Sequence, residues 1–218
     1  PIPYFADVQI GPEQFRVRAR HRLELVVFRG VVCVKKVYGD RVSFERELLA
    51  LDAMAGLPGV PRIVEAQYSP PILYQSFLLG RNLGDLMACH GAPVTIQHQV
   101  SMSFWGADRW RAQPLSPARD VALRALSASV SPAIVHRVGE LLSAIHRRGV
   151  TLSDVKYGNV LVVGDQPFFC DFDRATVFRW NSWRCVRERE VDRDLFNYCF
   201  GGGLLSERAF RVATKDLA

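Results

Sequence analysis

The chain has no long apolar run and no metal-type spacing of histidine or cysteine. No apolar run among its 218 residues approaches the roughly 20 residues that a membrane-spanning helix needs. No charged-then-apolar segment typical of a secretory signal stands at its start. The five cysteines are odd in number and widely spread, and the five histidines show no metal-ligand spacing. We therefore expect reduced thiols, no zinc site, no membrane span and a cytoplasmic protein.

The overall composition is that of an ordinary globular protein. Apolar residues make up 49% of the chain and charged residues 23%, and the length allows one sizeable domain or two lobes. The net charge of +6, from 28 basic and 22 acidic residues, favours an anionic partner. The strongest basic stretch, residues 174–193, also contains acidic residues, which argues against nucleic acid. An acidic peptide, a phosphorylated sugar and an anionic lipid head group all fit a positive segment there.

Two carboxylates and one carboxamide surround a predicted hairpin in the last third of the chain. Residues 154–159 read D-V-K-Y-G-N, and Asp171 begins the motif D-F-D. The segment between them consists of two apolar halves, rich in β-branched and aromatic residues, separated by a turn signal at 164–166. Because a hairpin brings its two ends to the same place, Asn159 and Asp171 should lie together.

These residue types suit phosphoryl transfer. Asn159 and Asp171 offer the amide and carboxylate oxygens that bind Mg²⁺ together with substrate phosphate oxygens. Asp154 would lie beside the metal without ligating it, free to orient or deprotonate an attacking hydroxyl. Lys156 would meet the charge that develops on the transferred phosphoryl group. The sequence therefore predicts a magnesium-dependent site in which Asp154 and Lys156 are catalytic and Asn159 and Asp171 hold the metal.

The motifs resemble those of the protein kinase-like superfamily, whose catalytic loop reads H-R-D-x-K-x-x-N and whose metal loop reads D-F-G. Apolar residues at helical spacing over 134–145, followed by a basic turn with a glycine at 146–149, predict the helix that a kinase places before its catalytic loop. The resemblance implies an α+β, two-lobed fold. A small antiparallel sheet with one helix would form the N-lobe (1–80), and a mainly helical C-lobe would carry the hairpin (81–218).

The resemblance also assigns the lysine that holds the nucleotide phosphates. Segments 23–28 and 31–37 predict the two strands of a hairpin. In kinases a strand of pattern V-A-x-K carries this lysine. Lys35 takes the role because Cys33 occupies the small-residue place two positions before it, and Lys36 would then point to the opposite face of the strand.

A glutamate on the next predicted helix completes this assignment. The helix starts at Ser43 and ends at a glycine and proline break at 56–59. Glu47 stands where a kinase keeps the glutamate that pairs with the strand lysine, so the resemblance pairs it with Lys35. The spacing favours Glu47 over Glu45, which cannot share the same helix face.

A connector follows the next predicted strand, which begins at Ile72, and leads to a helix at Leu83. In a kinase this connector is the hinge, here near residues 77–81, whose backbone groups bind the adenine edge. The candidates for that backbone contact are Phe77, Leu78 and Leu79.

The chain also departs from the kinase pattern. No G-x-G-x-x-G motif occurs in the first thirty residues, and Leu152 and Ser153 replace the His and Arg of the catalytic loop. Loss of that arginine predicts no switch by activation-loop phosphorylation. Asp173 replaces the glycine of D-F-G. Asp194 is a candidate to begin the helix whose aspartate braces the catalytic loop in larger kinases, or to be a simple helix-start residue.

The resemblance implies ATP- and Mg²⁺-dependent transfer of the γ-phosphoryl group to a hydroxyl. The motif D-x-K-x-x-N favours a Ser/Thr protein acceptor. The motif D-F-D-R-A and the short carboxy-terminal lobe resemble lipopolysaccharide core and Kdo sugar kinases, and more distantly RIO-type atypical kinases, so a glycan acceptor is an alternative. The missing glycine loop and altered H-R-D leave a pseudokinase, acting as a binding or scaffold module, as a third. Residues 88–131 match no kinase motif and would be a substrate insert or a helical connector.

Overall fold

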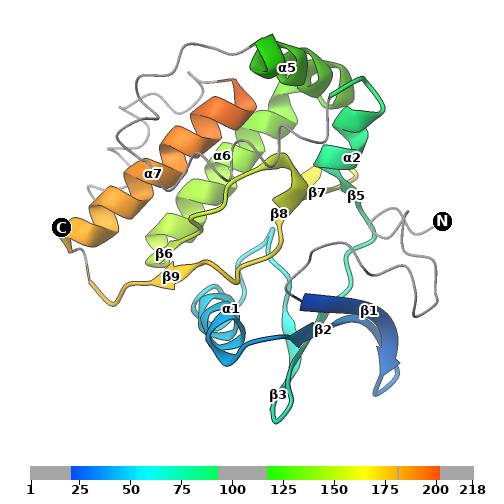
Figure 1. The fold of residues 1–218 in the computed structure, drawn as a ribbon, viewed down its shortest axis with the longest axis vertical. Helices are drawn as coiled ribbons and strands as arrows, with labels where there is room; N and C mark the ends of the chain where they lie inside the picture. Colours follow the sequence, from blue (N-terminus) through cyan, green and yellow to red (C-terminus); the bar gives the residue numbers. More distant parts are fainter. Residues whose placement is uncertain (1–20, 93–116, 181, 202–218) are drawn as a thin grey trace.

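The computed structural model describes residues 21–92, 117–180 and 182–201. The chain has an α+β fold, with a small antiparallel sheet and one helix at one end and the remaining helices at the other (Figure 1). This confirms the predicted α+β class. The division between residues 80 and 81 stays a prediction.

A four-stranded antiparallel sheet forms the amino-terminal part. It consists of β1 (His21–Phe28), β2 (Val31–Tyr38), β3 (Ile63–Tyr68) and β4 (Pro71–Ser76), in the order β1-β2-β4-β3. The turn between β1 and β2 has positive φ angles at Arg29 (51°) and Gly30 (78°). Two such residues give a tight hairpin whose twist matches the strands and whose length fixes their register. The predicted hairpin over 23–28 and 31–37 is confirmed.

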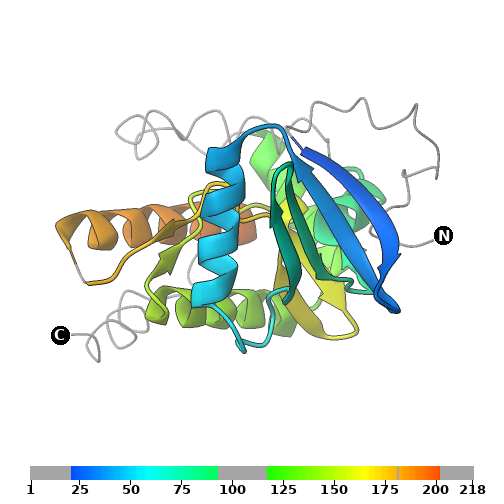
Figure 2. The same cartoon turned by 90° about the horizontal axis from the view of Figure 1, so that it is seen from below.

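Helix α1 (Arg41–Ala53) packs along this sheet (Figure 2). It starts two residues before the predicted Ser43 because Asp40 caps it: the Asp40 carboxylate accepts a hydrogen bond from the Ser43 N–H at 2.7 Å. The helix buries Phe44, Glu47 and Leu51. A charged residue thus lies within the face that α1 presents to the sheet.

Residues 77–80 connect β4 to β5 (Arg81–Asn82) and α2 (Leu83–Ala88). The predicted helix start at Leu83 is confirmed, and the Asn82 side chain caps it by accepting from the Gly84 N–H at 2.8 Å. A Cβ added at Gly80 would lie 2.7 Å from Val163 Cγ2, so the connector passes close to the strand β7 (Val160–Val163).

Three longer helices follow: α5 (Pro117–Ser129), α6 (Pro132–Arg147) and α7 (Trp183–Phe200). Helix α6 confirms the helix predicted over 134–145. The expected insert at 88–131 contains α5 at its end, and its residues 93–116 lie outside the described part of the chain. The prediction that a helix begins at Asp194 is wrong, because α7 begins at Trp183, where the Ser182 hydroxyl accepts from the Cys185 N–H.

The predicted hairpin of the last third is confirmed. Its strands are β7 (Val160–Val163) and β8 (Gln166–Phe169), and β5 pairs with the outer side of β7. A second small sheet pairs β6 (Val150–Thr151) with β9 (Thr176–Val177). The short 3-10 helix η3 (Tyr157–Asn159) precedes β7.

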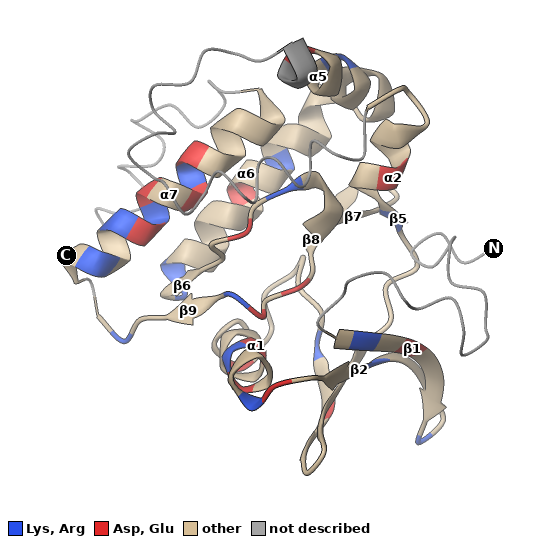
Figure 3. Cartoon of the chain, viewed as in Figure 1, with Lys and Arg blue, Asp and Glu red and all other residues tan. Residues whose placement is uncertain are grey.

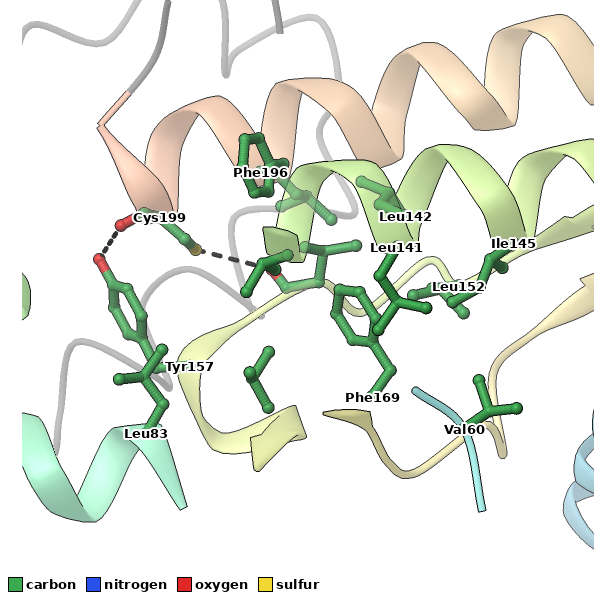
Figure 4. Packing of buried hydrophobic residues seen from close by; sticks show 14 of the residues in the cluster. Val60, Leu83, Leu141, Leu142, Ile145, Leu152, Tyr157, Phe169, Phe196 and Cys199 are labelled. Atoms are coloured by element: carbon green, nitrogen blue, oxygen red, sulfur yellow. Dashed lines mark hydrogen bonds between the residues drawn. The ribbon is translucent and has the colours of Figure 1, made fainter. Parts of the chain in front are cut away.

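Buried apolar side chains join the hairpin to the helices. Figure 4 shows Phe169 of β8 packed near Leu141 and Leu142 of α6 and Phe196 of α7. Leu152 lies in the same cluster and is buried. All five cysteines lie in the described residues and none forms a disulfide. None of the described helices is both long and apolar enough to cross a membrane.

Candidate functional site

A buried ammonium group links the sheet, helix α1 and the D-F-D motif. Lys36 Nζ of β2 donates to Glu47 Oε2 at 2.6 Å and to Asp171 Oδ1 at 2.6 Å. The second oxygen of Glu47 accepts from the Gln75 side chain of β4 at 2.7 Å. Lys36 and Glu47 are almost completely buried, whereas 39% of the Asp171 side chain is exposed. Three segments that are distant in the sequence therefore meet at one charged cluster.

The prediction that Lys35 pairs with Glu47 is wrong. Lys35 Nζ donates instead to Glu24 Oε2 of β1 at 2.9 Å, on the other face of the strand. Successive side chains of a strand point to opposite faces, and Lys36 shares its face with the buried residues Val34 and Tyr38. The choice of Glu47 on α1 is confirmed, although its partner is the neighbouring lysine.

The register of the β1–β2 hairpin distinguishes Lys35 from Lys36, and the resemblance to V-A-x-K does not take this register into account. The two-residue turn at 29–30 places Glu24 opposite Lys35 and Leu23 opposite Lys36. A carboxylate directly across from Lys35 forms a cross-strand ion pair. Lys36 has no such partner on β1, so its charge must be met by a residue from another element.

The charges of the cluster hold Lys36 in its ionised form. Burial disfavours the ammonium ion, but attraction to Glu47 and Asp171 outweighs this and raises the pKa of Lys36. The ring of Tyr38 lies beside the cluster, with its centroid 5.2 Å from Lys36 Nζ. Burial, together with the nearby Glu47 carboxylate, raises the pKa of Tyr38. The cluster therefore contains a fixed positive charge and a neutral phenol.

In the D-V-K-Y-G-N motif, the side chains of Lys156 and Asn159 both contact Asp154. Lys156 Nζ donates to Asp154 Oδ2 at 2.7 Å. Asn159 Nδ2 donates to the Asp154 carbonyl oxygen at 3.0 Å and to Asp154 Oδ2 at 3.2 Å. These bonds use the amide nitrogen of Asn159 and leave its carboxamide oxygen as the atom that can ligate a cation.

The hairpin brings the two candidate metal ligands to the same end. The Cys170 N–H donates to the Asn159 carbonyl oxygen at 2.9 Å, one step beyond the paired residues Val160 and Phe169. Asp171 follows at once and has a φ of 67°, which is uncommon for a residue with a side chain. Such backbone strain is found most often where a side chain must be aimed at a functional site.

Asp173, the second aspartate of D-F-D, bonds to the first described residue of β1. His21 Nε2 lies 3.1 Å from Asp173 Oδ2, and both side chains are buried. Burial by itself would raise the pKa of Asp173, but the bond to His21 and the positive charge of Lys36 outweigh it, and the pKa is lowered. No motif in the sequence predicts that these two residues meet.

A buried aspartate of α7 braces the backbone just before the D-V-K-Y-G-N motif. Asp192 accepts from the backbone N–H groups of Leu152 and Ser153, each at 2.7 Å, and from His146 Nε2 at 2.9 Å. The bracing residue is therefore Asp192, two positions before the predicted Asp194. Ser153 has a φ of 58°, so these bonds hold a backbone conformation that a serine rarely adopts.

The three predicted hinge residues lie in the connector between β4 and β5. Phe77 and Leu78 are half-buried and Leu79 is exposed. The Leu78 carbonyl oxygen accepts from the Gly80 N–H at 2.9 Å, which closes a tight turn in the connector. Their contact with an adenine stays a prediction.

Among the described residues, no group of three or more His, Cys, Asp or Glu side chains is arranged to hold a metal ion. The candidate site is smaller than that, with one carboxylate from Asp171 and one carboxamide from Asn159. This number and type of protein ligand is what Mg²⁺ uses when phosphate oxygens and waters complete its shell.

No family model matches the chain, and a search of curated proteins finds none that matches it. The interpretation of the site therefore rests on its residues and their geometry.

Proposed function

We propose that this chain is an ATP- and Mg²⁺-dependent phosphotransferase of the kinase-like type, which moves the γ-phosphoryl group to a hydroxyl. The observation that carries the proposal is the pair of hydrogen bonds that the Lys36 ammonium group donates to Glu47 and to Asp171. A phosphate-binding lysine must be held charged and in one place, and a helix carboxylate does both. Asp171, the second partner of this lysine, is itself a proposed metal ligand.

The nucleotide would lie between the Lys36 cluster and the connector at 77–80. Lys36 would contact its phosphates, and Glu47 would fix the direction of the lysine side chain. Because Asp171 is the more exposed of the two carboxylates, a phosphate oxygen can replace it as a partner of Lys36 while Glu47 stays bound. Lys35, bonded to Glu24 on the other face, has no part in this site.

The residues present fit a magnesium ion. Asp171 and the carboxamide oxygen of Asn159 would hold it, because the Asn159 amide nitrogen is already bonded to Asp154. When bound, Mg²⁺ neutralises charge on the nucleotide phosphates. The Asp171 carboxylate forms an ion pair with Lys36. A bound Mg²⁺ would compete with Lys36 for this carboxylate, and the lysine would then move toward the nucleotide phosphates.

Asp154 would orient the acceptor hydroxyl and accept its proton. Lys156, 2.7 Å from the Asp154 carboxylate, would stabilise the charge that develops on the transferred group. This lysine beside the catalytic carboxylate resembles the arrangement in Ser/Thr protein kinases and favours a protein hydroxyl as the acceptor. A glycan hydroxyl, which the D-F-D-R-A motif suggests, is the second candidate.

A thermal-stability titration with ATP, with and without Mg²⁺, tests the nucleotide site. A ligand at about 100 times its dissociation constant should stabilise the parent chain by about 2.7 kcal/mol. Asp171→Asn should lose the magnesium-dependent part of this shift. Asp165→Asn, in the exposed turn between β7 and β8, is the matched control and should keep the full shift.

Transfer is then measured with labelled ATP on a Ser/Thr-rich protein and on a phosphorylated glycan. Labelling of the protein alone supports the first acceptor and labelling of the glycan alone supports the second. A nucleotide-dependent shift without transfer or hydrolysis would make the chain a pseudokinase. Absence of any shift in a folded parent chain would contradict the proposal.

A further inference from the structure

The turn before α7 and the first turn of that helix expose an unusual set of side chains. Two tryptophans dominate it: 73% of Trp180 and 78% of Trp183 are exposed. We name this surface the tryptophan tip and define it by its six exposed apolar and basic residues, which are Val177, Arg179, Trp180, Trp183, Val186 and Arg187.

The tip is separate from the core-facing side of α7. Cys185, Asp192 and Phe196 on the inner side of the helix are buried. Trp183, with Val186 and Arg187, lies at positions three and four residues apart and therefore on one outer face. Tryptophan is highly buried on average, so two neighbouring rings that are about three-quarters exposed indicate a surface that meets another phase or molecule.

The tip lies at the periphery of the molecule. In Figures 1 and 2 the chain leaves β9, runs outward and turns back at the beginning of α7, beyond the ends of α1 and α6. The rings are thus carried on a projecting turn. A projecting surface can insert into the head-group region of a lipid bilayer without a preformed binding site. A protein partner would need a complementary pocket to cover both rings.

The charge of the tip is positive. Basic residues occur in the turn and at the start of α7 (Figure 3). Glu188 of α7 accepts from Arg184 at 2.9 Å and from the Thr151 hydroxyl at 2.9 Å. Its charge is therefore matched within the chain, while Arg179 adds positive charge beside the rings.

We propose that the tryptophan tip binds the surface of a lipid bilayer that contains anionic phospholipids. Tryptophan rings prefer the level of the lipid head groups, where an apolar body and a polar N–H are both satisfied. Arginine side chains beside them would bind lipid phosphates, and the same combination occurs in segments that lie on membranes. This peripheral contact needs no membrane-spanning helix and does not depend on phosphotransfer by the chain.

Co-sedimentation with vesicles tests the proposal. The parent chain should bind vesicles of phosphatidylcholine and phosphatidylserine and bind pure phosphatidylcholine much more weakly. The variant Trp180→Ala with Trp183→Ala should lose at least about tenfold in affinity, because two large apolar side chains no longer enter the interface. Arg179→Gln should lose about fivefold at low salt, and this loss should shrink at high salt.

A matched control removes exposed apolar groups elsewhere. Leu49 on α1 and Tyr68 on β3 are 59% and 58% exposed, and Leu49→Ala with Tyr68→Ala should bind vesicles like the parent. Circular dichroism and melting curves check that all variants are folded. The proposal is overturned if the parent does not bind anionic vesicles or if the tryptophan variant binds as well as the control. Binding of an acidic peptide without any binding of vesicles would also overturn it and would make the tip a protein-docking surface.

Discussion

His21 Nε2 and Asp173 Oδ2 lie 3.1 Å apart, joining the beginning of β1 to the D-F-D motif across the interior of the molecule. The ring of His21 also packs beside Tyr38, with 4.7 Å between the ring centroids. Asp173 stands where a kinase-type metal loop has glycine, which could make no such bond. This contact attaches the D-F-D motif directly to the sheet.

The His21–Asp173 contact predicts a change in acid sensitivity. Because the pKa of Asp173 is lowered in the folded chain, its ionised form stabilises the fold at neutral pH, and this stability is lost as the pH falls below about 4. Asp173→Asn should cost about 1–2 kcal/mol at pH 7 and should lose less further stability on acidification than the parent. Urea unfolding from pH 7 to pH 3 measures this difference.

His21→Phe is the companion variant. It keeps a ring beside Tyr38 and removes the nitrogen that contacts Asp173. Like Asp173→Asn, it should therefore lose less free energy of unfolding than the parent when the pH falls from 7 to 3. Parallel curves for the parent and Asp173→Asn over the whole range would contradict the argument.

Lys36→Met and Lys35→Met should differ strongly in stability. Loss of Lys36 leaves the Glu47 carboxylate buried without its cation, which typically costs about 3–5 kcal/mol. Lys35 and Glu24 form a partly exposed pair, and its loss should cost under about 1 kcal/mol. Urea unfolding of both variants measures the difference.

The same two variants show which lysine contributes to nucleotide binding. Lys35→Met should keep the Mg-ATP shift, whereas Lys36→Met should lose it. Equal effects of the two variants on stability and on the shift would refute the assignment of Lys36.

Asp192→Ala should destabilise the chain much more than Asp194→Ala. Asp192 is fully buried, and its removal leaves two backbone N–H groups and the His146 ring without their acceptor, at a cost of about 3 kcal/mol or more. The Asp194 side chain is 32% exposed, and its removal should cost under about 1 kcal/mol. Thermal and urea unfolding measure both changes, and similar losses for the two variants would argue against Asp192 as the brace.

Asp154→Asn should separate chemistry from binding. The Mg-ATP shift should remain, since Asp154 is not a proposed ligand of the nucleotide or the metal. Phosphotransfer should fall by a factor of about 10²–10⁴, the usual effect of losing a positioned acid–base group. A parallel loss of binding and transfer would assign Asp154 to the metal site instead.

Residues near one another in the sequence determined the local elements. The turns at 29–30 and 164–166 and the apolar spacing over 134–145 predicted two hairpins and α6, and all three occur. Two-residue turns and helical periodicity encode these elements within a few residues of chain, so no distant contact is needed to specify them. The same local reasoning placed Asn159 and Asp171 at one end of a hairpin.

Only the tertiary structure decided which face of each element meets a distant part of the chain. Both faces of β2 carry apolar residues, and the resemblance to V-A-x-K favoured Lys35. Packing of α1 against the other face brought Glu47 to Lys36 instead. The choice of Asp192 over Asp194 followed in the same way from the rotation of α7 about its axis, which turns Asp192 toward the backbone of Leu152 and Ser153 after β6. The contact of His21 with Asp173 joins residues 152 positions apart in the chain. Such pairings depend on the relative placement of whole elements, which the burial of many side chains fixes together and no short motif encodes.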